Sequence, residues 1–151
     1  MEKRLPLSVQ VVVYRRMPGN KVLVLGLRRA VESKIWWQPV TGGVIKGETL
    51  EDAAFRETLE ETGLTEPVRF HNIDYAHSYR INRRYRKYYD DDITVKKEYA
   101  FGWETDAEEI RLSSEHIDYR WLSPGEAVER FRYRGNKEAV RRLIKHLEDE
   151  T

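Results

Sequence analysis

A 23-residue segment, GGVIKGETLEDAAFRETLEETGL, constrains this chain more than any other part of its sequence. It begins at Gly42, and within it a glycine-containing loop gives way to a helical pattern. Thr49 followed by Asp52 is typical of a capping box at a helix start, and Gly63 supplies the left-handed residue at which helices commonly end. The sequence therefore predicts a helix from Thr49 to Thr62.

Three glutamates of this helix share one face. At about 100° per residue, Glu60 and Glu61 lie roughly 60° and 40° to either side of Glu57. Phe55 and Leu59 fall on the opposite face, so we expect these two to pack on the core and the acids to face outward. Clustered carboxylates repel one another, and a divalent cation that also binds phosphate oxygens would reverse this cost. The alternative interpretation is a solvated acidic helix.

The overall composition limits the kinds of partner and of metal site. The chain has 151 residues, with 27 Lys and Arg against 26 Asp and Glu, so its net charge favours neither nucleic acid nor a membrane as the main partner. It has no cysteine, which leaves oxygen or imidazole to hold any metal. No apolar run is long enough to span a bilayer and no signal sequence is present, so we expect a cytoplasmic protein. The length fits a single domain, residues 1–151.

Hydrophobic periodicity and turn residues predict the other elements. We expect strands at 9–14, 21–27, 37–41, 68–79, 95–104 and 119–122, and further helices at 124–131 and 137–147. Strands interspersed with helices, without a repeating strand–helix–strand series, predict an α/β or α+β sandwich with a mixed β-sheet.

The segment from Gly42 to Leu64 resembles the Nudix box, whose charged and glycine positions are all matched here. Thr58 departs from it, because a small or apolar residue usually follows the Arg-Glu pair. The resemblance implies a Nudix-type α/β/α sandwich and hydrolysis of a pyrophosphate bond. It also implies that Glu57, Glu60 and Glu61 bind catalytic magnesium, with manganese as the alternative.

Further roles follow from the same resemblance. It implies that the backbone carbonyl of Gly42 completes the metal shell, and that Arg56 is a catalytic-site residue held by Glu48. A carboxylate is expected to take the proton of the attacking water, with Glu57 and Glu60 among the catalytic candidates. Arg56 also has a simpler interpretation, as a helix-surface ion pair with Glu60.

Outside the box, several segments resemble the branch of the family that comprises dATP pyrophosphohydrolase and dihydroneopterin triphosphate pyrophosphatase. These segments are Trp37–Gly42, Glu115–Leu122 and Asn136–Val140. In that branch the glutamate of the Glu-His pair reaches the metal site, so Glu115 is a candidate metal ligand or general base. Its alternative is a loop carboxylate in water, and His116 is expected to be structural or solvated.

Four residues are candidates for substrate binding. Trp37 and Gln38 could stack on and hydrogen-bond to a base or pterin ring, although core packing explains a tryptophan equally well. Arg28 and Arg29 could bind phosphate through bidentate contacts, or be ordinary surface arginines.

The stretch from Tyr79 to Tyr89, YRINRRYRKYY, interleaves five basic residues with four tyrosines. By itself it would suggest nucleic-acid binding. Because Asp90, Asp91 and Asp92 follow at once, we favour a charged hairpin loop near the pocket mouth that steers polyphosphate or contacts a second subunit.

The sequence thus predicts magnesium-dependent release of pyrophosphate from a nucleoside, deoxynucleoside or dihydroneopterin triphosphate, by a monomer or homodimer. One alternative is hydrolysis of a dinucleoside polyphosphate or a nucleoside diphosphate sugar on the same helix. The other is a non-catalytic module that binds nucleotide or RNA.

Overall fold

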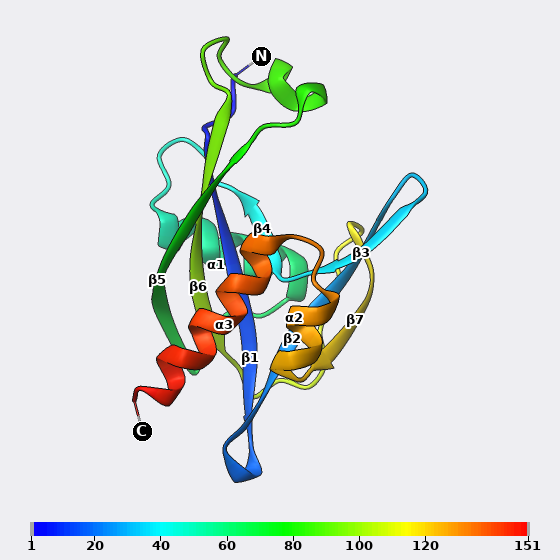
Figure 1. The fold of residues 1–151 in the computed structure, drawn as a ribbon, viewed down its shortest axis with the longest axis vertical. Coiled ribbons are helices and arrows are strands. Elements are labelled where there is room, and N and C mark those ends of the chain that lie inside the picture. Colours follow the sequence, from blue (N-terminus) through cyan, green and yellow to red (C-terminus); the bar gives the residue numbers. More distant parts are fainter. Residues whose placement is uncertain (1, 151) are drawn as a thin grey trace.

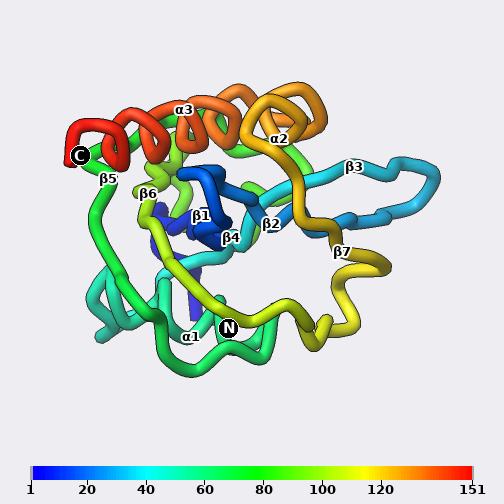
Figure 2. The backbone as a smooth tube through the Cα atoms, turned by 90° about the horizontal axis from the view of Figure 1, so that it is seen from below, coloured from blue at the N-terminus to red at the C-terminus, as the bar shows by residue number. Residues whose placement is uncertain are grey.

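The computed structural model describes residues 2–150, in which a seven-stranded sheet is covered by helices on both faces. Figure 2 shows α1 (Leu50–Thr62) on one side of the sheet, and α2 (Pro124–Arg130) with α3 (Arg134–Glu148) on the other. The predicted α/β/α sandwich is therefore confirmed. The expected domain, 1–151, extends one residue beyond the described range at each end.

The strands form a mixed sheet, as predicted. They are β1 (Leu7–Met17), β2 (Lys21–Val31), β3 (Lys34–Gln38), β4 (Val40–Gly43), β5 (Arg69–Arg80), β6 (Val95–Glu104) and β7 (His116–Leu122). The order is β3-β2-β1-β6-β5, with β4 on β1 and β7 on β2. Strands β1 and β6 are parallel, and the other pairs are antiparallel.

The segment predicted as one strand, 37–41, is divided between two. Strand β3 pairs with β2 and ends at Gln38, and β4 pairs with β1 from Val40 onward. Pro39 stands between them, where its missing N–H interrupts the ladder. The chain therefore crosses from β2 to β1 at this proline, which brings Gly42 beside the start of β1.

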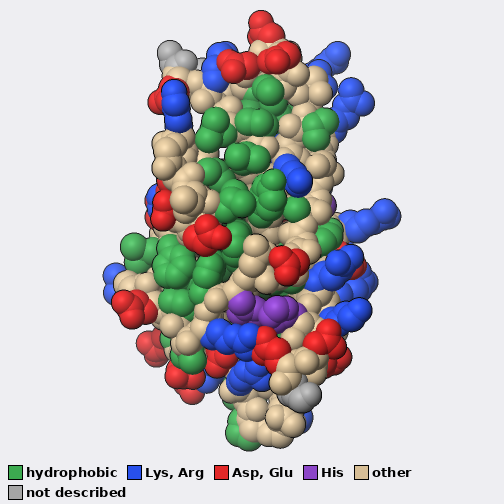
Figure 3. Space-filling view, turned by 90° about the vertical axis from the view of Figure 1, so that its left-hand side faces the viewer, with side chains coloured by type: hydrophobic (Ala, Val, Ile, Leu, Met, Phe, Trp, Pro, Cys, Tyr) green, Lys and Arg blue, Asp and Glu red, His purple; other side chains and the backbone are tan. Residues whose placement is uncertain are grey.

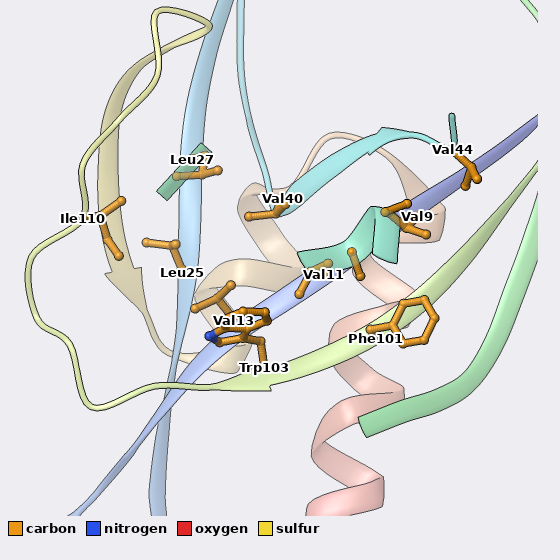
Figure 4. Close-up of a cluster of buried hydrophobic side chains, with 12 residues drawn as sticks. Val9, Val11, Val13, Leu25, Leu27, Val40, Val44, Phe101, Trp103 and Ile110 are labelled. Atoms are coloured by element: carbon orange, nitrogen blue, oxygen red, sulfur yellow. The ribbon is translucent and has the colours of Figure 1, made fainter. Parts of the chain in front are cut away.

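Strand β1 is buried on both faces because helices cover both. Val9, Val11 and Val13 alternate toward α1, where they meet Phe101 and Trp103 (Figure 4). Other β1 side chains, Val12 and Tyr14 among them, pack toward α3. This alternation gives the sheet two separate apolar cores.

The stretch from Tyr79 to Tyr89 lies at the end of the β5–β6 hairpin, as predicted for a hairpin loop. It contains a short 3₁₀ helix, Arg83–Tyr88, which the sequence analysis did not anticipate. Figure 1 shows this end of the hairpin beside the N-terminal segment. Within residues 2–150, no helix combines the length and the apolar character that crossing a membrane requires.

Candidate active site

Helix α1 is fixed at both ends by side chains and backbone of its own sequence. The Thr49 hydroxyl accepts a hydrogen bond from the Asp52 amide at 3.0 Å, and the Asp52 carboxylate accepts one from the Thr49 amide at 3.1 Å. Gly63 ends the helix with φ 78° and donates its N–H to the Leu59 carbonyl at 2.9 Å. The predicted limits of the helix are therefore confirmed, with Thr49 as its cap.

The side of α1 that faces the sheet differs from the prediction. Apart from Glu61, its buried residues are small: Ala53, Ala54, Thr58 and Thr62. The Leu59 side chain is 49% exposed and Phe55 is 36% exposed, with Phe55 packing sideways against the rings of Phe70 and Trp103. The expectation that Phe55 and Leu59 form the core-facing side was wrong for Leu59, whereas Phe55 reaches the core at its edge, through Trp103. Small residues let the helix approach the sheet with part of its acidic face turned inward.

At Gly42 the backbone of the sheet lies against a side chain of α1. A Cβ atom at Gly42 would stand 2.0 Å from the Glu57 carboxyl carbon, so the carboxylate fills the space that a side chain would need. Gly42 pairs with Val9 of β1, which fixes its position in the sheet. Only glycine allows Glu57 to lie against the backbone here.

Arg56 holds the loop and the helix together. Its guanidinium donates to both Glu48 oxygens, from Nε at 2.7 Å and from Nη2 at 3.0 Å. It also donates to the Gly43 carbonyl at 2.8 Å and to Glu57 Oε1 at 2.7 Å. The predicted contact with Glu48 is thus present and it lowers the pKa of Glu48, while the alternative ion pair with Glu60 is the longer one at 3.5 Å.

Glu61 is the most unusual group of the cluster. Glu61 is 2% exposed, and neither carboxylate oxygen makes a hydrogen bond of ordinary geometry, although the Glu57 side chain and the Thr41 backbone lie close enough to shift its pKa. Burial, followed by the adjacent Glu57 carboxylate, raises the pKa of Glu61. Buried polar atoms are almost always satisfied in folded proteins, so an unpaired buried carboxylate points to a partner from outside the chain.

This donor set fits a divalent cation. Hard carboxylate oxygens are the ligands that magnesium and manganese prefer, and Glu61 has two free ones beside Glu57. Glu60 lies farther out, with its side chain 55% exposed. Within residues 2–150 no three acidic or histidine side chains are arranged so that they could hold a metal ion as they stand, and Arg56 occupies one oxygen of Glu57.

A buried chain of hydrogen bonds approaches Glu61 from β3. The Trp36 indole N–H donates to Gln38 Oε1 at 2.9 Å, and Gln38 Nε2 lies 3.3 Å from His116 Nε2. Because an indole can only donate, the Gln38 amide must donate to His116, whose Nε2 is then the acceptor. His116 Nε2 in turn lies 3.8 Å from Glu61 Oε1, and burial, followed by the charge of Arg29, lowers the pKa of His116 to about 4.

The structure brings Glu115 to the same place. Its carboxylate is exposed, and its charge contributes to the raised pKa of Glu61. His116, the next residue, was expected to be structural or solvated, and it is buried. The Glu-His pair therefore places one side chain at the surface and the other beneath the acidic helix.

The predicted substrate-binding residues are divided between the two faces of the sheet. Arg28 pairs with Trp37, and Arg29 with Trp36, across β2 and β3, so each pair shares a face. Trp37 packs in the core beneath α2, and the Arg28 guanidinium lies over its ring at 5.8 Å. The proposed contact of Trp37 and Arg28 with a ring or phosphate at the acidic helix does not fit this position.

Arg29 and Gln38 do lie on the face of α1, and they are joined there by Trp36. Trp36 was not among the residues predicted for the site. The signal was present, because residues two apart on a strand share a face and Trp36 precedes Gln38 by two.

Comparisons with known proteins identify relatives of the chain. Residues 4–144 match the model of the NUDIX domain. The dihydroneopterin triphosphate diphosphatase of Haemophilus influenzae is 32% identical over 143 residues, covering 93% of this chain and 88% of that protein. The asymmetrical bis(5'-nucleosyl)-tetraphosphatase of Mus musculus is 30% identical over 127 residues, covering 79% and 80%. Among solved structures, the dihydroneopterin triphosphate pyrophosphohydrolase of Escherichia coli superposes with a TM-score of 0.79 at 26% identity, covering 97% of this chain and 99% of that one.

Proposed function

This chain belongs to the NUDIX family of hydrolases, and on that premise we propose that it releases pyrophosphate from a dihydroneopterin, nucleoside or deoxynucleoside triphosphate. The observation that carries the proposal is the buried Glu61 carboxylate, which lies unpaired beside Glu57. The relatives named for dihydroneopterin triphosphate, which align with nearly the whole chain, make it the first substrate to test.

We further propose that Glu57, Glu60 and Glu61 hold a divalent cation, magnesium first and manganese as the alternative, with the Gly42 carbonyl as an additional oxygen donor. The buried, unpaired oxygens of Glu61 support this assignment. For Glu115, a role as metal ligand is the alternative to its role as general base. Such a cation, when bound, would neutralise phosphate charge and polarise the reacting phosphorus.

The remaining roles belong to residues of the chain itself. Arg56, anchored by Glu48, holds Glu57 against Gly42 and keeps the carboxylate oriented. Water attacks a phosphorus atom, the bond from that atom to the bridging oxygen breaks, and a carboxylate takes the proton. We assign this last role to Glu115, because its side chain is exposed and forms no ion pair within residues 2–150. Of the two arginines predicted to bind substrate, we keep Arg29 in that role. Gln38 is instead assigned a positioning role, through its hydrogen bond to His116.

A substrate panel tests the reaction. We expect purified protein with magnesium to form pyrophosphate and a monophosphate from dihydroneopterin triphosphate or a dNTP, and to stop when a chelator is added. The panel includes NTPs, diadenosine tetraphosphate and nucleoside diphosphate sugars, and product identity distinguishes these activities. If the protein hydrolysed none of these compounds, the proposal would be refuted.

Substitution of the helix acids tests the metal assignment. Glu60→Gln removes one charge from the proposed ligand set and should lower kcat by a factor on the order of 100. Glu51→Gln is the matched control, because Glu51 is exposed in the first turn of the same helix, away from the cluster. Full activity in the Glu60 variant would contradict the assignment.

A second candidate function is hydrolysis of a dinucleoside tetraphosphate. The relative from Mus musculus, named for that activity, supports it. Mononucleotide products from diadenosine tetraphosphate, with no turnover of the triphosphates, would favour this candidate.

A further inference from the structure

A groove of about 400 Å³ adjoins Arg56 and Glu57 and has no role in the chemistry described above. Its walls are the N-terminal segment 2–5, the loop 43–46 after β4, and Lys96 near the start of β6. The groove therefore lies between the acidic helix and the N-terminal segment. Figure 1 shows that segment beside the end of the β5–β6 hairpin.

The groove carries an excess of positive charge. Its lining contains four cations in addition to Arg56: Lys3, Arg4, Lys46 and Lys96. Within residues 2–150, none of these four forms an ion pair with a carboxylate. The acids of the lining are Glu2 and Glu57, and Glu57 is already paired with Arg56. An anion is the ligand that such a lining favours.

The aromatic stretch of the hairpin holds Lys96 in place. Lys96 Nζ donates to the Tyr89 hydroxyl at 3.2 Å and lies over the same ring. It also stands 4.0 Å from the position of a Cβ atom on Gly43. The Gly43 carbonyl accepts a hydrogen bond from Arg56, so Lys96 and a side chain of the acidic helix both lie beside Gly43.

The same stretch holds the N-terminal segment. The Arg4 guanidinium lies 4.3 Å from the centre of the Tyr88 ring, and the Arg4 amide donates to the Tyr88 carbonyl at 2.7 Å. Lys3 Nζ donates to the Lys87 carbonyl at 3.1 Å. These contacts give the basic and tyrosine-rich hairpin loop a role that does not involve nucleic acid, since they fix two cations at the rim of the groove.

We propose that this groove binds the terminal phosphates of the substrate, and therefore the pyrophosphate product. The scissile bond then lies over Glu57, and the ring of the substrate lies toward Gln38 and Trp36. This inference rests on the proposed function and adds the orientation of the substrate within that site. Lys96 and Lys46 bind phosphate oxygens, and Tyr89 is a positioning residue for Lys96.

The direct test is calorimetric titration with inorganic pyrophosphate in the presence of magnesium. Lys96→Gln and Lys46→Gln should each weaken binding by roughly threefold to tenfold, as expected for one charge-assisted contact at a partly exposed site. Lys21→Gln is the matched control, because Lys21 is an exposed lysine of the β1–β2 hairpin and does not line the groove. The affinity for Mn²⁺ alone should be unchanged in all three variants.

Kinetics distinguish a binding role from a structural one. In Lys96→Gln and Lys46→Gln we expect a higher KM for the triphosphate and a higher inhibition constant for pyrophosphate, with kcat within about twofold of the original protein. Lys96→Arg should restore KM and the inhibition constant. Tyr89→Phe should weaken pyrophosphate binding by less than Lys96→Gln does, because only the hydroxyl contact is lost.

Failure of the groove assignment and failure of the proposed function would give different results. Unchanged pyrophosphate affinity in Lys96→Gln and Lys46→Gln, with hydrolysis intact, overturns the groove assignment and leaves the proposed function standing. Absence of triphosphate hydrolysis, with pyrophosphate affinity still dependent on the two lysines, refutes the proposed function and supports an oligophosphate site in the groove.

Discussion

At Glu61 the chain places a carboxylate where folding alone gives no reason for one. Burial without a hydrogen-bond partner costs free energy, and the neighbouring Glu57 adds repulsion. A chain selected only for stability would carry an apolar or amide side chain here. The position is therefore one where stability is given up for function.

Replacing this side chain should make the metal-free protein more stable. In the presence of a chelator, we expect Glu61→Gln to raise the free energy of unfolding by about 1–3 kcal/mol, because the amide removes the free-energy cost of burying this carboxyl group beside Glu57. Urea denaturation measures this, and Glu60→Gln on the exposed side of the same helix should change it little. Magnesium should stabilise the original protein and fail to stabilise the Glu61 variant. A less stable Glu61 variant would mean that the carboxylate has a structural partner.

His71 couples stability to pH at a site remote from the acidic helix. Its Nε2 lies 3.0 Å from the Tyr14 hydroxyl, its ring stacks on His146, and Arg69, Glu150 and Arg16 surround it. Figure 3 shows histidine side chains between acidic and basic ones on the side of the molecule along β5. Burial, followed by the charge of Arg69, lowers the pKa of His71 from 6.5 to about 4.

The direction of the pH effect follows from that shift. As the pH falls below about 6.5 the unfolded chain binds a proton at His71, whereas the folded protein does not do so until about pH 4. The contribution of neutral His71 to the stability of the fold is therefore complete above pH 6.5 and is lost as the pH falls toward 4. Between pH 7 and pH 5 we expect the free energy of unfolding of the original protein to fall by about 1–2 kcal/mol more than that of His71→Gln. The glutamine keeps a partner for Tyr14. His116 titrates in both proteins, so parallel stability curves would exclude a role for His71.

At the scale of elements, the caps of α1 explain why this helix forms where it does. Removing the Thr49 hydroxyl breaks one half of the capping box and leaves the Asp52 amide without a partner. We expect Thr49→Ala to lower the free energy of unfolding by about 1 kcal/mol in urea denaturation. Thr65→Ala, in the exposed loop after the helix, is the control and should have no measurable effect. Equal effects of the two substitutions would show that the box does not stabilise the helix.

The same helix shows how much the sequence could predict and where it could not. Its limits are local properties of Thr49, Asp52 and Gly63, and they were predicted correctly. Its rotation depends on what it packs against. Acids were expected to face solvent and Phe55 and Leu59 to face the core, but the space left by Gly42 admits Glu57 instead. Periodicity cannot reveal such a space, because it arises only when β4 has been placed beside β1.

The binding residues outside the helix illustrate the same limit. Trp37 and Gln38 are adjacent in sequence and were assigned together, yet a strand sends adjacent side chains to opposite faces. The ladder between β2 and β3 then assigns Trp37 to the core under α2 and Trp36 to the site. Alternation was available from the sequence, but which face carries α1 was not.

At the scale of the whole molecule, the two helical layers have different tasks. The layer of α1 carries the acidic cluster, which the cationic groove adjoins at Arg56 and Glu57, whereas α2 and α3 cover the opposite face. On that face a buried polar network joins the start of α3 to the sheet. Gln10 accepts from the Asn136 amide at 3.0 Å and donates to the Gly135 carbonyl at 3.2 Å, while His77 lies 3.0 Å from Glu98.

Gly135 offers a test of this division, because the His77 ring leaves no room for a side chain there. A Cβ atom at Gly135 would stand 2.2 Å from that ring, so Gly135→Ala must shift either α3 or the histidine and its contact with Glu98. We expect the free energy of unfolding to fall by about 1–3 kcal/mol. Measured well below the melting temperature, kcat and KM should stay within about twofold, since the sheet separates Gly135 from Glu57. Gly125→Ala, in α2 with open space around its Cβ position, is the matched control for stability. A change in kcat with stability intact would instead mean that the two faces of the sheet are coupled, and that α3 helps to position the acidic helix through β1.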